Sequence, residues 1–288
     1  MTLSTFRAGL LLLPLAACNK GDKVAAYAEI PAVELVTTTA QGSTTSKITD
    51  AWVSLDDHFL GVWELPARIP MLAEGSHKVT VTPAIKRNGT FDDRLRYPFF
   101  TSWDGVTDLT REGTTVLSPQ TNYIPEAELW IEAFEDVFAR LNVSDDSDTT
   151  LIRYVPAENP GLLFLDDSPC GGFKLEGTRD HMRLYTDEDF EVNGGPVFLE
   201  LDYRSNVVIA VGALFSVGGT LGSSELVYVT PTLKSDGTMP WNKIYIDLST
   251  VFNAPVTDRD VYIDVLLPSG QSSAEVFIDN FKLVKLAP

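Results

Sequence analysis

The chain has 288 residues and a formal net charge of −18, with 40 acidic side chains against 22 basic ones. Affinity for nucleic acid depends on Lys and Arg neutralising phosphates, so this charge argues against nucleic acid as a partner. It also argues against electrostatic attraction to an anionic lipid surface. The length is enough for two domains of ordinary size.

The chain opens with an apolar run over residues 8–17, preceded by Arg7. A bilayer-spanning helix needs about 20 apolar residues, so this run is too short to cross and is typical of a signal peptide. Its end, Leu15-Ala16-Ala17-Cys18, resembles the lipobox of bacterial lipoproteins. The resemblance implies removal of residues 1–17 and acylation of Cys18, for example with palmitate. The alternative is an ordinary signal peptide with an incidental cysteine.

The residues after Cys18 indicate in which membrane the protein is anchored. Residues 18–23 form the acylated cysteine and a short tether, and residue 19 is Asn, not Asp. By resemblance to the usual lipoprotein sorting rule, this implies anchoring in the outer membrane, on either of its faces. Two or more acyl chains anchor a protein stably. We therefore expect a covalent lipid on Cys18 to hold the chain at the membrane.

The remaining chain consists mainly of short alternating runs. Examples are KVTVTPAI (78–85), VFLELDY (197–203) and VYIDVLL (261–267), and turn-forming clusters such as RNGTFDD and VNGGP separate them. Alternation of apolar and polar residues between such turns predicts antiparallel β-sandwiches. The predicted fold class is therefore all-β.

One segment is ambiguous. In AELWIEAFEDVFARLN (127–142), apolar residues recur at helical spacing, but several of them also share one face of a strand. We interpret the segment as a domain junction followed by the first strand of a second domain. The predicted domains are residues 24–125 and residues 126–288.

The first domain resembles PEGA-type and related immunoglobulin-like modules of the bacterial envelope. The match covers about 35 residues, and the residues that carry it are Asp56, Gly61, Leu72, Gly75, His77, Val79 and Val81. The resemblance implies an immunoglobulin-like β-sandwich that serves as a spacer or an interaction domain.

The second domain resembles the galactose-binding-like jelly rolls of many carbohydrate-binding modules. The similarity rests on its opening EAFEDVF, its ending AEVFIDNFKLVKL and the internal phrases FEVNGGPVFLELDYRSN and PWNKIYIDLS. The resemblance implies a larger jelly-roll β-sandwich whose first and last strands lie side by side. It further implies an early acid and a late aspartate near one structural calcium ion.

Asp279 is the most informative carboxylate of the chain. At period two it shares a strand face with Phe277, Phe281 and Leu283, which are all apolar. A carboxylate on a buried face needs a partner, because burial of an unpaired charge is costly. Asp279 is therefore a candidate site residue.

Calcium is one possible partner, since it binds oxygen ligands. The family resemblance implies Glu135 and Asp136 as companions of Asp279 around such an ion. The alternative is that Asp279 pairs with a backbone amide or with a cation such as Lys174.

Sugar binding requires exposed aromatic rings. Tyr185, Phe190 and Trp241 lie near turn residues and are the candidate ligand-binding rings. For each of them the alternative is packing in the core or at its rim.

The sequence carries no signature of catalysis. It lacks G-x-S-x-G, H-E-x-x-H and a phosphate-binding glycine loop. Cys170 has acids and no close basic neighbour in the sequence, so we expect a buried, unreactive thiol. We expect a non-catalytic lipoprotein whose jelly roll binds a glycan or another envelope ligand. The alternative is an accessory structural subunit of an outer-membrane protein complex, which binds protein through both domains.

Overall fold

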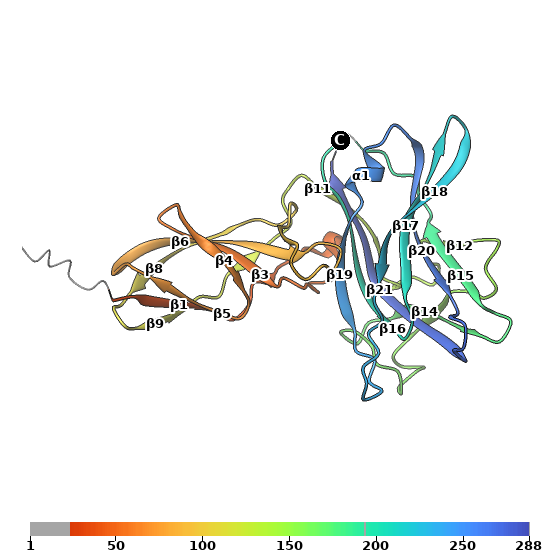
Figure 1. Cartoon of the computed structure of the whole chain (residues 1–288), viewed down its shortest axis with the longest axis horizontal. Helices are drawn as coiled ribbons and strands as arrows, with labels where there is room; N and C mark the ends of the chain where they lie inside the picture. Colours follow the sequence, from red (N-terminus) through yellow and green to blue (C-terminus); the bar gives the residue numbers. More distant parts are fainter. Residues whose placement is uncertain (1–23, 193, 288) are drawn as a thin grey trace, which may run out of the picture.

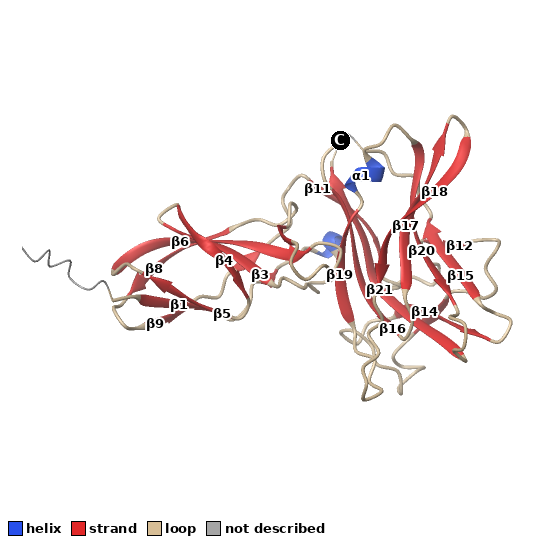
Figure 2. Ribbon diagram, viewed as in Figure 1, coloured by secondary structure: helices blue, strands red, loops and turns tan. Residues whose placement is uncertain are grey.

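The structure, a computed structural model, describes residues 24–192 and 194–287. The prediction of an all-β protein is confirmed, because strands make up nearly all of its regular structure (Figure 2). Within the described residues, helix is limited to α1 (Ser249–Phe252) and a 3-10 turn, η1 (Thr39–Gln41). None of the helices described is long and apolar enough to cross a membrane.

The first domain is a β-sandwich of two sheets. One sheet has the order β5 (Ala67–Met71), β1 (Ala26–Ile30), β9 (Thr114–Val116). The other contains β4 (His58–Glu64), β3 (Asp50–Leu55), β6 (Gly75–Lys86), β7 (Arg94–Arg96) and β8 (Trp103–Leu109). Alternate residues of β1 and β5 are buried, and they pack against β3 and β6 in one apolar cluster. The short pair β2 (Glu34–Leu35) and β10 (Gln120–Thr121) leads toward the second domain.

The second domain is a larger sandwich. Its six-stranded sheet contains β13 (Ile152–Tyr154), β14 (Cys170–Glu176), β21 (Ser273–Leu286), β16 (Val197–Ser205), β19 (Asn242–Asp247) and β11 (Ala127–Glu132). Its five-stranded sheet has the order β12 (Leu141–Val143), β15 (His181–Thr186), β20 (Thr257–Leu266), β17 (Ile209–Val217), β18 (Thr220–Val229). Residues Ala127–Glu132 at the start of the ambiguous segment form β11, which pairs antiparallel with the last strand, β21, as the jelly-roll resemblance implied. The order expected within the segment was wrong, because the strand comes first and residues 133–140 form the connection to β12.

The two outer faces of this sandwich differ. The first domain lies against the outer face of the six-stranded sheet, hereafter the covered face (Figure 1). The outer face of the five-stranded sheet, hereafter the open face, lies on the side away from the first domain (Figure 1). The position of the first domain therefore decides which jelly-roll surface is left for a ligand.

A β-bulge sets the side-chain directions on β21. Between the pairs Glu200–Lys282 and Asp202–Asp279, β16 contributes one residue and β21 contributes two. Asn280, at this bulge, has a φ of 46°. A bulge reverses which residues share a face. Asp279 therefore does not share a face with Phe281 and Leu283, which belong to the core of the sandwich, and the sequence-based placement was wrong.

Candidate functional site

The residues predicted to bind calcium do not form a cluster. Glu135 and Asp136 are exposed in the connection after β11, whereas Asp279 is 1% exposed on β21. Among the residues that the structure describes, no group of three or more His, Cys, Asp or Glu side chains could hold a metal ion. The positions of these carboxylates therefore give the calcium prediction no support.

Asp279 pairs with a backbone amide, which was one of the alternatives to calcium. Its Oδ1 accepts a hydrogen bond from the backbone N–H of Asn280 at 2.7 Å, and its Oδ2 accepts one from Ser168 Oγ at 3.1 Å. Burial raises the pKa of the Asp279 carboxyl to about 7, against the opposing effect of these two hydrogen bonds. The carboxyl is therefore stabilised in its protonated form by its surroundings.

The three aromatic candidates have different environments. Phe190 is 3% exposed in the core, where its ring makes an edge contact with Trp130 at 5.8 Å. Its prediction as a ligand-binding ring was wrong, because the loop that carries it folds inward. Tyr185 is half-buried on the open face, and Trp241 is half-buried next to the start of β19. Only these two remain candidates for ligand contact.

The structure describes one of the two cysteines. Cys18, the predicted acylation site, lies outside the described residues. Cys170 is a buried free cysteine on β14, and burial followed by the nearby Asp279 charge raises its pKa to about 12. The expectation of a buried Cys170 is confirmed, and its raised pKa favours the protonated thiol at neutral pH.

The covered face carries a buried polar network centred on Glu200. Glu200 is 0% exposed, and its carboxylate accepts hydrogen bonds from the hydroxyls of Tyr97 and Tyr123, each at 2.9 Å. Lys243 Nζ lies 3.6 Å from Glu200 Oε2. A buried carboxylate requires such partners, and here two of the three come from the first domain.

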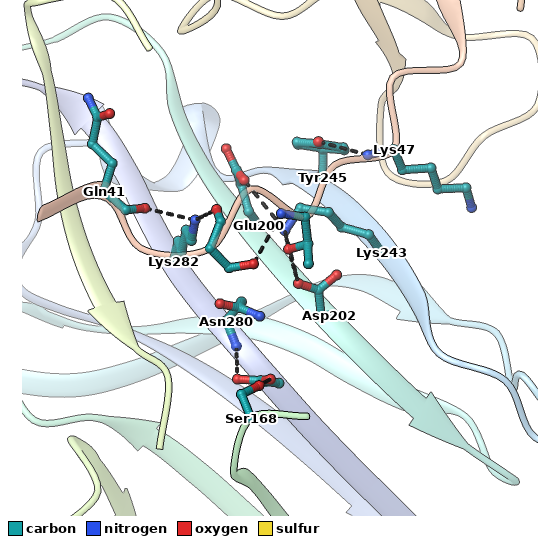
Figure 3. Close-up of polar contacts among 12 residues, drawn as sticks. Gln41, Lys47, Ser168, Glu200, Asp202, Lys243, Tyr245, Asn280 and Lys282 are labelled. Carbon is teal, nitrogen blue, oxygen red and sulfur yellow. Dashed lines mark hydrogen bonds and ion pairs between the residues drawn. The ribbon is translucent and has the colours of Figure 1, made fainter. Parts of the chain in front are cut away.

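Lys282 forms a second part of the network (Figure 3). Its side chain is fully buried, and Nζ donates to the backbone carbonyls of Gln41 and Ser43, each at 2.8 Å. Burial lowers the pKa of Lys282 to about 8. Nearby, Thr45 Oγ1 donates to Asp202 Oδ2 at 2.6 Å. The segment Gln41–Thr45 of the first domain is thus tied to β16 and β21.

Aromatic packing closes the rest of the interface. Tyr97 of the first domain lies 5.0 Å from the ring of Tyr245 and 5.2 Å from that of Phe198, measured between centroids. These rings belong to one apolar cluster that spans both domains. At the margin, Arg87 Nη1 lies 3.3 Å from Asp247 Oδ2. Because the part of the covered face under these rings is packed like a protein core, that part is closed to a ligand.

The open face carries charged side chains that pair across strands. His181, Arg183 and Tyr185 alternate with the core residues Met182 and Leu184 along β15, so they point outward. These three side chains lie next to strand β20. Near the middle of the row, a guanidinium–carboxylate pair joins β15 to β20.

Asp264 of β20 is the acceptor of that pair. Arg183 Nε donates to Asp264 Oδ2 at 2.6 Å, and His181 Nε2 lies 3.3 Å from the same oxygen. The half-buried Arg183 also lies 5.1 Å from the centroid of the Tyr262 ring. Charge-assisted bonds of this kind fix the directions of donors and acceptors.

Tyrosines complete the open face. The Tyr262 ring lies across Gly212 of the next strand, where an added Cβ would come within 2.5 Å of the ring, so a glycine is required there. On the edge strand, Tyr228 is 65% exposed, and its hydroxyl donates to Glu225. Tyr185 lies opposite Tyr262 in the register of β15 and β20. The open face thus combines the partly exposed rings of Tyr185 and Tyr228 with oriented polar groups, whereas the Tyr262 ring is buried.

The sequence prediction missed Arg183, Tyr228 and Asp264. A signal for Arg183 was present, because His181, Arg183 and Tyr185 alternate with two apolar residues. Arg183 and Asp264 are 81 positions apart, so their pairing depends on the antiparallel contact of β15 with β20.

The sequence matches no protein-family profile and no curated protein. The chain is similar to solved structures of carbohydrate-binding modules. One is CBM28, a module specific for non-crystalline cellulose, at 14% identity and a TM-score of 0.37 over 54% of this chain and 92% of that one. Another is the xylan-binding domain from CBM22, at 11% identity and a TM-score of 0.38 over 55% of this chain and 94% of that one.

A third is TmCBM61 in complex with β-1,4-galactotriose, at 20% identity and a TM-score of 0.30 over 50% of this chain and 88% of that one. At these values the likeness assigns no ligand to this chain.

Proposed function

We propose that this chain is a non-catalytic lipoprotein, anchored in the outer membrane through acylated Cys18, whose jelly roll binds a glycan on its open face. The observation that carries the glycan part is the composition of that face. It presents the rings of Tyr185 and Tyr228 beside the oriented pair of Arg183 and Asp264. The opposite face of the jelly roll is occupied by the first domain.

The chemistry of the open face suits a sugar. A pyranose ring has an apolar face, which packs on an aromatic ring, and a rim of hydroxyls, which need both donors and acceptors. Tyrosine offers such a ring together with a polar tip. Arg183 is a donor and Asp264 is an acceptor, and each is already held in place by the other. A few well-placed polar groups next to rings are typical of ligand sites.

The proposed anchor is consistent with the direction of the open face. The described chain begins at Val24, at the end of the first domain that lies away from the jelly roll (Figure 1). A chain held at Cys18 would therefore direct its open face away from the membrane. Cys18→Ala should release the protein from membrane fractions. If the variant still requires detergent for extraction, the anchor proposal is wrong.

The glycan proposal is tested on an oligosaccharide array with the purified chain lacking residues 1–18. We expect binding to at least one glycan, and we expect Tyr185→Ala and Tyr228→Ala to reduce it with no change in melting temperature. An array without signal, together with an outer-membrane protein captured in equal amount from solubilised envelopes, would contradict the proposal.

That last outcome would favour a second candidate, docking onto an outer-membrane protein complex. One observation favours it: Val137 and Phe138 are 79% and 88% exposed in the loop after β11. They line a hollow of about 230 Å³ together with Leu151. Exposed apolar groups of this kind are often contact sites for protein. Phe138→Ser should then abolish the capture and leave the chain folded.

A further inference from the structure

A groove runs between the two domains beside the covered face. Its volume is about 380 Å³, and its lining residues are Thr45, Ser46, Lys47, Leu165, Asp202, Trp241, Asn242 and Lys243. The first three belong to the first domain and the others to the jelly roll. Because both domains line it, neither domain alone would form this groove.

Trp241 provides an aromatic wall of the groove. It lies immediately before β19, and its indole Nε1–H donates to the backbone carbonyl of Leu163 at 2.9 Å. Trp241 is half-buried and belongs to none of the three apolar core clusters. The hydrogen bond fixes the edge of the ring, so a face of the ring can serve as a wall without further ordering.

Donors and acceptors surround this ring. Asn242 accepts from Lys47 Nζ at 2.7 Å and donates to the Tyr203 hydroxyl at 2.8 Å. Lys243 Nζ lies 3.3 Å from Asp202 Oδ2 (Figure 3). Sugar hydroxyls both donate and accept hydrogen bonds. The groove offers both kinds of group next to the indole ring, in the form of an amide and a paired ammonium and carboxylate.

The charge of the groove favours a neutral sugar. Its lining carries the ammonium groups of Lys47 and Lys243 and the carboxylate of Asp202, and Glu200 lies 3.6 Å from Lys243. These two positive and two negative charges balance, so the groove offers no net charge to attract an acidic or a basic sugar. A hydroxyl, in contrast, can donate to a carboxylate.

A smaller cavity of about 160 Å³ extends the groove along the edge of the sandwich. It shares Lys47, Asn242 and Lys243 with the groove, and it also touches Tyr228 of the open face. Tyr228 of the open face and Trp241 therefore border two neighbouring hollows.

We propose that this interdomain groove is a second saccharide-binding site, which holds one neutral sugar ring against Trp241. The site goes beyond the proposed function, because it requires the docking of the two domains and does not require binding on the open face.

The test uses the full chain without residues 1–18, labelled with fluorotryptophan and observed by fluorine NMR. The Trp241 signal is assigned by its loss in Trp241→Phe. The probes are neutral hexose and pentose hexasaccharides and a galacturonate hexasaccharide, each at millimolar concentration. We expect a neutral probe to shift the Trp241 signal, while the signal of the buried Trp130 stays in place.

Trp241→Ala should weaken the binding of that probe about tenfold, and Tyr185→Ala should leave the shift of Trp241 intact. The second variant separates the two proposals, because it affects the open face alone. Absence of a shift with every neutral probe, or a shift with galacturonate only, would overturn the proposed groove site. The open-face proposal would stand in either case if the array signal depends on Tyr185.

Discussion

The two outer faces of the jelly roll contain similar residue types and use them in opposite ways. On the covered face, Glu200, Lys282 and Tyr245 are 0–1% exposed and bind partners in the first domain. On the open face, the side chains of Arg183 and Asp264 pair with each other within one sheet, and Tyr185 lies on a strand of the same sheet. A charged or aromatic side chain on a strand is therefore no sign of a ligand site until the packing of its face is known.

The comparison predicts that the covered face stabilises the protein strongly. Lys282→Met should lower the free energy of unfolding by about 3–5 kcal/mol, because it removes two hydrogen bonds from a charged donor and leaves the carbonyls of Gln41 and Ser43 without their partner. Urea unfolding measures this change. The matched control is Lys234→Met, at an exposed lysine in the loop before β19, which should change stability by less than about 0.5 kcal/mol. Equal effects of the two variants would contradict the role assigned to the network.

A second variant tests whether a core ring contributes to stability without contributing to glycan binding. Phe190→Ala should also cost about 3–5 kcal/mol, since the ring packs against Trp130 and Phe252. Its glycan binding, measured well below the unfolding transition, should equal that of the unmodified chain. Weaker binding with unchanged stability would restore Phe190 as a ligand-binding ring.

The protonation of Asp279 predicts a pH effect from the covered face. Its pKa is about 7 in the folded protein and near 3.8 when unfolded, so between these pH values the folded protein holds the extra proton. Stability should therefore fall as pH rises through this window, by up to about 1.4 kcal/mol per pH unit. Asp279→Asn should remove this part of the slope. Identical slopes for the two proteins in urea unfolding from pH 4 to pH 7 would refute the assignment.

The smallest expected effect lies on the open face. Tyr185→Ala should weaken glycan binding about tenfold, equivalent to about 1.4 kcal/mol, with little change in stability. Isothermal titration with the glycan identified on the array measures it. Phe59→Ala, at a 57% exposed ring of the first domain, is the control and should bind normally. Loss of binding in both variants would point to nonspecific adsorption.

The sequence indicated the residue types of part of the site, but it did not indicate where each residue lies in the fold. Tyr185 was identified from its position near a turn and lies on the open face, whereas Phe190, five residues later, is in the core. The difference arises because the loop after β15 turns inward and brings Phe190 against Phe252, which is distant in sequence.

Asp279 shows a different limit. The expectation that this carboxyl needs a partner was confirmed, since a buried carboxyl is costly in any fold. Its neighbours on the strand face were misassigned, because a single extra residue at Asn280 reverses the alternation. The bulge is visible only in the pairing of β16 with β21.

The all-β class and the need of Asp279 for a partner were predictable from the sequence, and the family resemblance implied the pairing of the first and last jelly-roll strands. These depend on periodicity, on composition and on family-like phrases, all of which are local. Which jelly-roll face is free, and how the groove at Trp241 forms, depend on tertiary contacts. Both depend on contacts between residues more than 100 positions apart, such as Tyr97 with Glu200 and Thr45 with Asp202, which no local pattern encodes.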